Sequence, residues 1–234
     1  MNLEAILMSR GDRCHLCGAP LDFENETIVV DHVEPQAQGG SNDLSNLLLA
    51  HSKCNSFKKD NPVELVRPFL HFQKEAEKIG RVKFGDVKKH CGIKTIECEL
   101  TITNNELRIH NTGGADIVTP LLEEPKPDAS KEMGKQKTAY ALIPFSLIWN
   151  DDSVQPRAIY AKHIWNLVKD LYRNPLHEAP SVRIEEASSG KKRLVMFDGQ
   201  HKSVAMMLHG REACVFKIYV DYSAEEATVL VNSI

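Results

Sequence analysis

The sequence lacks the features that mark membrane and secreted proteins, and it has little excess of either charge. No apolar run approaches the roughly 18 residues that a membrane-spanning helix needs. The first residues, MNLEAILMSRGDR, show no basic region before their apolar stretch and no small-residue cleavage site. Lysine plus arginine number 29 against 32 acidic residues, so the net charge of −3 gives no global basic field. We therefore expect a cytoplasmic protein without membrane contact, in which any binding of nucleic acid depends on a local basic patch.

What is present suits a globular protein. The 234 residues, 42% hydrophobic and 26% charged, fit one large domain or two modest ones. In a reducing compartment, clustered cysteines are more often metal ligands than disulfides. Of the six cysteines, three have suitable neighbours, and the other three are expected to be ordinary small apolar residues (Cys91, Cys98 and Cys214).

Two motifs of equal spacing enclose the first module. Cys14 and Cys17 are separated by two residues, and so are His51 and Cys54. Three sulfurs and one imidazole suit a closed tetrahedral zinc site. The segment from residue 10 to residue 60 has too little apolar core to fold unaided, so bound zinc would supply the missing folding free energy. The sequence therefore predicts structural Zn²⁺ on these four side chains.

Side chains suited to phosphodiester hydrolysis lie between and just after these motifs. The reaction needs a base for the attacking water and a cation that stabilises the leaving oxygen. His32 suits the base because imidazole titrates near neutral pH, and Asp31 and Asn55 offer oxygen atoms to Mg²⁺ or Mn²⁺. Lys58 and Lys59 are candidates for phosphate contacts, although a solvated helix face explains them equally well.

The order of these residues along the chain is itself informative. It runs Cys14-x-x-Cys17, Asp31-His32, Pro35, Gly39-Gly40, Asn46-Leu47, Cys54-Asn55 and Lys58. Residues 12–60 thereby resemble the HNH endonuclease family. The resemblance implies a ββα-metal fold, a water activated by His32 and oriented by Asn46, and a catalytic cation held by Asp31 and Asn55. Asn55 stands where the family pattern has His, and His51 stands where cysteine is the commoner zinc ligand.

The rest of the chain is predicted to be α+β. We expect a helix over 62–79 with Pro68 inside it, and a β-hairpin over 93–110. Later elements are expected at 140–148 (strand), 157–172 (helix), 194–197 (strand), 203–209 (helix) and 215–220 (strand). The predicted organisation is a zinc module (1–61), a connector (62–110), a linker (111–138) rich in glycine and proline, and a separate α/β domain (139–234).

A second motif, Asp198-Gly199-Gln200-His201-Lys202, falls between a predicted strand and a predicted helix. Gly199 permits a tight turn, and the N–H groups at a helix N-terminus favour anions, but a purely structural turn explains the segment equally well. With its surroundings from Ile143-Pro144 to Ala227, it resembles the ParB/sulfiredoxin-like superfamily, in particular the DGQHR proteins associated with DNA phosphorothioate modification. The resemblance implies that the turn binds nucleotide phosphate or approaches DNA. Lys202 replaces the family's arginine, which removes bidentate phosphate binding, and the chain's last helical pattern begins only near Ala224, which would leave such a domain truncated.

These features favour a metal-dependent DNA endonuclease whose second domain senses a nucleotide, modified DNA or a partner. Pairing the two resemblances suggests a place in anti-phage defence or in a mobile element. One alternative is a non-catalytic zinc-containing DNA-binding regulator, in which Asp31, His32 and Asn55 only support the fold. Another is a nucleotide hydrolase or binder that uses Asp198, His201 and Lys202.

Overall fold

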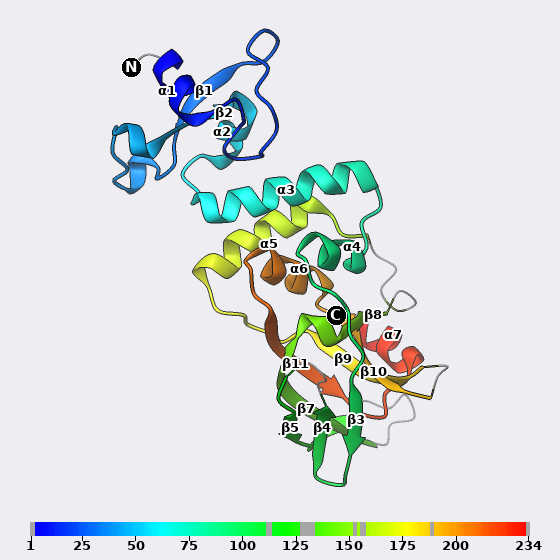
Figure 1. Cartoon of the computed structure of the whole chain (residues 1–234). Helices are drawn as coiled ribbons and strands as arrows, with labels where there is room; N and C mark the ends of the chain where they lie inside the picture. Colours follow the sequence, from blue (N-terminus) through cyan, green and yellow to red (C-terminus); the bar gives the residue numbers. More distant parts are fainter. Residues whose placement is uncertain are drawn as a thin grey trace. The chain divides into compact units, whose positions relative to one another are not determined.

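The chain forms two compact units, Met1–Gly80 and Arg81–Ile234, which are described separately (Figure 1). The computed structural model describes residues 3–110, 114–126, 134–151, 154, 158–187 and 190–232. Within these ranges, no helix combines the length and the apolar character that crossing a membrane requires.

Unit 1 is built around a β-hairpin followed by a helix. Its elements are α1 (Leu3–Arg10), β1 (Ile28–His32), β2 (Leu47–His51), α2 (Ser52–Lys58) and α3 (Val63–Ile79). Strands β1 and β2 pair antiparallel, with Asp31 opposite Leu48 and His32 opposite Leu47. Because α2 starts directly after β2, unit 1 has the ββα order that the HNH resemblance implies.

The apolar core of unit 1 is small. Ile6, Leu16, Leu47 and Leu49 are buried in it. Helix α3 adds four buried side chains of its own: Leu65, Val66, Phe69 and Phe72. The Phe57 ring of α2 stacks on Phe69 with centroids 5.6 Å apart, which joins α3 to the ββα elements. The predicted helix over 62–79 is confirmed, and it continues through Pro68 to a C-cap at Gly80, whose φ of 78° suits glycine.

Unit 2 is a mixed α/β unit with two sheets. Its helices are α4 (Phe84–His90), α5 (Ala161–Arg173), α6 (Gln200–Leu208) and α7 (Ala224–Asn232). Strands β3 (Glu99–Ile102), β4 (Glu106–His110) and β5 (Ile117–Pro120) form an antiparallel sheet. The larger sheet has the order β6-β7-β11-β9-β10-β8, from β6 (Leu122–Lys126), β7 (Gly134–Pro144), β8 (Ile148–Asn150), β9 (Ser181–Glu186), β10 (Lys192–Asp198) and β11 (Ala213–Tyr219).

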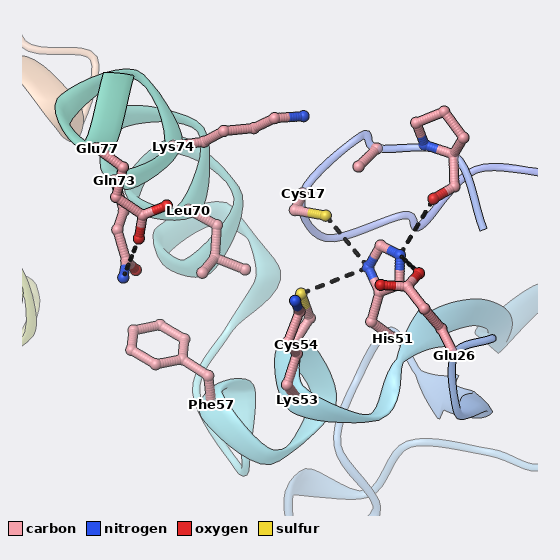
Figure 2. A pocket seen from close by; sticks show the side chains of 12 residues that line it. Cys17, Glu26, His51, Lys53, Cys54, Phe57, Leu70, Gln73, Lys74 and Glu77 are labelled. Carbon is pink, nitrogen blue, oxygen red and sulfur yellow. Dashed lines mark hydrogen bonds and ion pairs between the residues drawn. The ribbon is translucent and has the colours of Figure 1, made fainter. Parts of the chain in front are cut away.

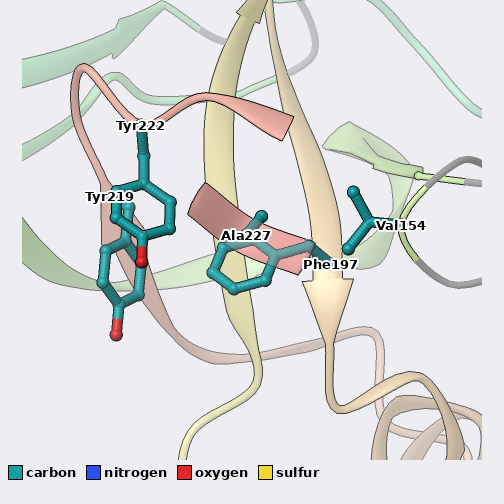
Figure 3. Packing of buried hydrophobic residues seen from close by; sticks show 5 residues of the cluster. All are labelled: Val154, Phe197, Tyr219, Tyr222 and Ala227. Atoms are coloured by element: carbon teal, nitrogen blue, oxygen red, sulfur yellow. The ribbon is translucent and has the colours of Figure 1, made fainter. Parts of the chain in front are cut away.

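The large sheet is mixed, and helices cover it. β11 runs parallel to β9 and β10 runs parallel to β8, whereas the β6–β7, β7–β11 and β9–β10 pairs are antiparallel. The buried side chains of α5 (Ile164, Val168 and Leu171) form its apolar face, and α6 is buried almost throughout. Beside α7, Phe197 of β10 and Tyr219 of β11 pack with Tyr222 and with Ala227 of that helix (Figure 3). Unit 2 therefore has a core of its own.

Several predicted elements of unit 2 are confirmed with shifted ends. The hairpin of 93–110 is β3 and β4, paired from Glu99 to His110. The helix expected at 203–209 starts earlier, at Gln200, and the helix expected at 157–172 runs from Ala161 to Arg173; Arg157 lies outside the described residues. The strand expected at 140–148 is interrupted, because β7 ends at Pro144 and β8 begins at Ile148. Proline has no N–H to continue a ladder.

The stretch predicted as a linker, 111–138, contributes strands to both sheets of unit 2. It contains β5, β6 and the first residues of β7, while 111–113 and 127–133 lie outside the described residues. β6 lies at the edge of the large sheet, so Pro125 is tolerated there. Prolines and charges that suggest a linker are equally suited to an edge strand.

Candidate functional site

The two equally spaced motifs meet at one point in unit 1. The ligand atoms of Cys14, Cys17, His51 and Cys54 all lie within 4.8 Å of one another. His51 Nδ1 is 3.4 Å from Cys17 Sγ and 3.8 Å from Cys54 Sγ. Around a tetrahedral zinc ion with its usual bond lengths, sulfur and nitrogen ligands are about 3.5 Å apart. The donor set and its spacing therefore fit Zn²⁺.

Local backbone geometry holds the first two ligands in place. Gly18 N donates to Cys14 O and Cys14 N donates to Ala19 O, which closes a tight turn around the Cys-x-x-Cys motif. His15 N donates to Leu49 O of β2, so this turn is attached to the hairpin. His51 ends β2 and Cys54 lies in α2. The ββα order thus brings both halves of the ligand set together.

The second ring nitrogen of His51 is also engaged. His51 Nε2 lies 3.0 Å from Glu26 Oε2 and 3.2 Å from Pro20 O, so it donates its hydrogen outward and leaves Nδ1 for the metal (Figure 2). Zinc-binding histidines commonly make such a bond to a carboxylate or a carbonyl, which fixes the tautomer and the ring orientation. Glu26 and Pro20 would therefore act as outer supports of a zinc ion bound to these side chains.

The three cysteine thiols affect one another's pKa. A hydrogen bond with Cys54 lowers the pKa of Cys14 to about 4, and the same pairing raises the pKa of Cys54. Burial raises the pKa of Cys17. Zinc would replace these shared protons, because a thiol that coordinates zinc is deprotonated. A cavity of about 450 Å³ lies beside these thiols, lined by Cys17, Cys54, Phe57 and Leu70 among others (Figure 2).

His32 is the last residue of β1, and its ring is held by an amide. His32 Nε2 is 2.9 Å from Asn42 Oδ1, and Gln36 Nε2 donates to the same oxygen at 2.9 Å. An amide oxygen only accepts hydrogen bonds, so Nε2 of His32 carries the hydrogen and Nδ1 keeps its lone pair. The arrangement leaves Nδ1 able to take a proton from water.

Asn46 shapes the loop that follows His32. Its Oδ1 accepts a hydrogen bond from Glu34 N (2.8 Å), and its Nδ2 donates to Glu34 O and Ser41 O (3.1 and 2.8 Å). Its backbone O accepts from Val33 N. Gly40 lies against the same loop, and a Cβ there would be 1.9 Å from Glu34 O. Gly40 and Asn46, from the Gly-Gly and Asn-Leu motifs, therefore serve the conformation of this loop.

Asp31 is buried and fully engaged. Lys58 Nζ lies 3.0 Å from Asp31 Oδ1, and His15 Nε2 lies 2.8 Å from Asp31 Oδ2. Lys58 is 1% exposed, and its ammonium also donates to His32 O at 2.6 Å. The expectation that Lys58 contacts a phosphate does not fit this placement, because its charge is used inside the unit. Lys59 is exposed and has a positive φ of 49°, which is strained for lysine.

The expected ligands of Mg²⁺ or Mn²⁺ are therefore not equivalent. Asn55 is half-buried in α2, and within the described residues its side chain makes no hydrogen bond. Asp31 has both oxygens occupied, one of them by an ammonium group. Asn55 fits a role as oxygen ligand, but Asp31 and Asn55 together do not fit a preformed cation cage.

The Asp198–Lys202 turn lies at the start of α6, as expected from the sequence. Gly199 has a φ of 81°, and a Cβ there would be 2.7 Å from Pro180 Cβ, so glycine is required. Gln200 is buried and donates to Asn150 Oδ1, and Lys202 Nζ pairs with Glu178 Oε2 at 2.8 Å. His201 lies beside His163, with ring centroids 6.2 Å apart. The cation expected to bind a phosphate is already paired with a carboxylate.

The ββα order, the four metal-ligating side chains and the loop after His32 agree with one family. Residues 14–61 match the model of the HNH endonuclease family. HNH endonucleases are nucleases that act on DNA, so the match indicates a phosphodiester hydrolase. No curated protein matches the chain. The match ends before α3, and the resemblance of residues 139–234 to ParB/sulfiredoxin-like proteins stays a prediction.

The roles of His15, Asn42 and Arg67 were not apparent from the sequence. His15 Nδ1 accepts a hydrogen bond from Arg67 Nη2 (3.0 Å), and Arg67 Nε donates to His15 O (2.9 Å). The position of His15 inside the Cys-x-x-Cys motif gave no sign of this role, since that position needs no particular side chain. Arg67 comes from α3, beyond the HNH motif, and no spacing rule connects the two.

Proposed function

We propose that unit 1 is a DNA endonuclease that hydrolyses phosphodiester bonds with Mg²⁺ or Mn²⁺ and is stabilised by structural Zn²⁺. The observation that carries this proposal is the hydrogen bond between His32 Nε2 and Asn42 Oδ1. The ring hydrogen of His32 is committed to Asn42, so Nδ1 can act as a base beside a zinc-binding ββα module that matches the HNH family.

In the proposed reaction, His32 Nδ1 takes a proton from a water molecule. The water oxygen attacks phosphorus on the side opposite the leaving oxygen, the bond from phosphorus to that oxygen breaks, and the leaving oxygen takes a proton from solvent. A bound Mg²⁺ or Mn²⁺ supplies positive charge for the phosphate. Asn46 contributes by keeping the loop from Val33 to Ser41 in its conformation. Lys53 and Lys59, both exposed in and just after α2, are the proposed contacts for flanking phosphates.

The test is nicking of supercoiled plasmid by zinc-loaded protein with Mg²⁺ or Mn²⁺, comparing wild type with His32→Ala. Loss of a general base should reduce the rate by about 100-fold or more. His177→Ala, an exposed histidine of unit 2, is the matched control and should nick like wild type. If folded, zinc-loaded wild type fails to nick DNA with either Mg²⁺ or Mn²⁺, a zinc-containing DNA-binding regulator would instead be favoured.

For unit 2 we propose a sensing role for nucleotide or modified DNA, supported by the ParB/sulfiredoxin-like resemblance and by the Gly199 turn at the start of α6. The pairing of Lys202 with Glu178 argues against strong phosphate binding. A nucleotide hydrolase is separable by experiment: nucleotide turnover that is lost in His201→Ala and kept in His32→Ala would support it. A role in anti-phage defence or in a mobile element rests on the pairing of the two resemblances.

A further inference from the structure

The surroundings of Asp31 differ from those of a cation ligand. Its side chain is 5% exposed, and one oxygen faces Lys58 Nζ while the other faces His15 Nε2. The Lys58 side chain is 1% exposed, so its ammonium is shielded from solvent. A divalent cation on Asp31 would lie beside this ammonium, with little water to weaken the repulsion.

The hydrogen bonds run in one direction through His15. Arginine only donates, so the bond from Arg67 Nη2 requires that Nδ1 of His15 accept. Nε2 of His15 then carries the hydrogen that is donated to Asp31 Oδ2. Arg67 and Asp31 thus require the same tautomer of His15, and the ring holds the carboxylate of Asp31 in place.

Lys58 connects this carboxylate to the proposed base. Its Nζ donates both to Asp31 Oδ1 and to the backbone oxygen of His32, at 3.0 and 2.6 Å. A buried ammonium needs such a partner, because an unpaired buried charge is strongly unfavourable. The end of β1, where His32 lies, is therefore held from α2 through Lys58.

The geometry points to Asp31 as a positioning residue: it is the central anion of an Arg67–His15–Asp31–Lys58 network that holds the backbone of His32, and it is not a ligand of the catalytic cation. The catalytic part of this inference rests on the proposed nuclease function. Asn55 remains the proposed protein ligand for the cation, because within the described residues its side-chain oxygen makes no hydrogen bond.

Binding of Mn²⁺ to the whole zinc-loaded chain of 234 residues, followed by electron paramagnetic resonance, tests the ligand assignment without requiring cleavage. Asp31→Asn should change the dissociation constant by less than about twofold, whereas Asn55→Ala should weaken binding by about tenfold or more. Weakening by Asp31→Asn equal to that by Asn55→Ala, or binding that Asn55→Ala leaves unchanged, would overturn the assignment.

A matched pair at His15 tests the positioning role. Gln can accept from Arg67 and donate to Asp31, whereas Ala can do neither. His15→Ala should lower kcat for nicking by about 10- to 100-fold, as loss of supporting hydrogen bonds commonly does, with KM nearly unchanged, and His15→Gln should recover much of the loss. Equal kcat in wild type and folded His15→Ala would overturn the role.

The tautomers give a readout that does not depend on activity. Nitrogen NMR of wild type should show His15 and His32 both protonated at Nε2, and Arg67→Ala should shift the Nδ1 signal of His15, because that nitrogen loses its hydrogen-bond donor. An unchanged His15 signal in folded Arg67→Ala would overturn the network. Should wild type fail to nick DNA, the proposed nuclease function fails, while Mn²⁺ binding and the NMR signals still decide the roles of Asp31 and the network.

Discussion

The ring of His32 and the loop after it depend on a few individual residues. Asn42 Oδ1 accepts the hydrogen bond from the His32 ring. The Asn46 side chain accepts from the backbone N–H of Glu34 and donates to its backbone oxygen. Gly40 allows the loop to pass close to the same Glu34 oxygen. Each contact is local, but each fixes an orientation that catalysis would need. Substitution at these positions should therefore affect kcat more than folding, except at Gly40.

At Asn42, we expect Asn42→Ala to lower kcat for nicking by about tenfold or more, because His32 loses the acceptor that fixes its tautomer and ring orientation. Asn42→Asp keeps an acceptor oxygen and should retain most of kcat, while its negative charge raises KM for DNA. Steady-state nicking with both variants separates the two effects. Wild-type kcat in Asn42→Ala would mean that His32 is oriented by other groups.

At Gly40, we expect Gly40→Ala to destabilise unit 1 by at least about 1–3 kcal/mol, since the new Cβ would lie 1.9 Å from backbone and the loop must move. Gly39→Ala is the neighbouring control. Its Cβ meets nothing within 4 Å, and its cost is the positive φ of 93° alone, about 1 kcal/mol. Thermal unfolding of both variants, with zinc content measured, gives the comparison. A Gly40→Ala protein as stable as Gly39→Ala would contradict the close approach.

Among the elements of unit 2, α4 is joined to β8 by a buried lysine. Lys88 is 2% exposed, and its Nζ donates to Thr95 Oγ1 at 2.6 Å and to Ile148 O at 2.9 Å. Both partners are neutral, so burial lowers the pKa of Lys88 to about 8. These hydrogen bonds attach α4 to β8, but burying the charged ammonium of Lys88 without a carboxylate partner is unfavourable for folding.

The unfavourable burial of this charge predicts that the unfolding free energy depends on pH. The pKa of Lys88 is lower in the folded protein than in the unfolded chain, so between about pH 8 and the unfolded value near 10.5 the unfolded chain binds more protons. The contribution of Lys88 to stability should thus rise with pH across this window, by up to about 3 kcal/mol, and be constant below it. The difference in unfolding free energy between wild type and Lys88→Met isolates it. A difference that does not change from pH 7.5 to 10 would refute the shift.

How well the sequence predicted an element depended on whether the signal was local. The helix α3 begins after Pro62 and ends at Gly80, and the β3–β4 hairpin alternates apolar residues, so both could be read from neighbouring positions. The strand β9 was missed because Arg183 interrupts its pattern. Arg183 is buried only because Asp151, 32 residues away, pairs with it at 2.6 Å.

The candidate site follows the same rule. The four zinc ligands were predictable because two fixed spacings present them. The partners of Asp31 were not, because they come from the Cys-x-x-Cys turn and from the end of α2, and Arg67 reaches the network from α3. Lys58 read as a surface cation for the same reason: only the folded unit places Asp31 and His32 O around its ammonium.

At the scale of the molecule, the two units differ in what holds them together. Unit 2 has an extensive apolar core that includes Ile143, Phe216 and Ile218. The ββα part of unit 1 buries few large side chains, and its hairpin, α2 and the Cys-x-x-Cys turn converge on the four zinc ligands. Metal binding should therefore account for much of the folding free energy of unit 1 and for little of that of unit 2.

We accordingly expect zinc chelation to unfold one unit only. After treatment with a strong chelator, hydrogen exchange should lose protection across β2 and α2 (Leu47–Lys58) while β11 (Ala213–Tyr219) stays protected. Cys17→Ser should act like the chelator, because it removes one zinc ligand, whereas Cys98→Ser, at a buried cysteine of unit 2 outside the ligand set, should leave Leu47–Lys58 protected. Protection lost in both units on chelation would show that unit 2 depends on unit 1 for its fold. Protection kept in both would show that the apolar core and the Asp31 network stabilise unit 1 without metal.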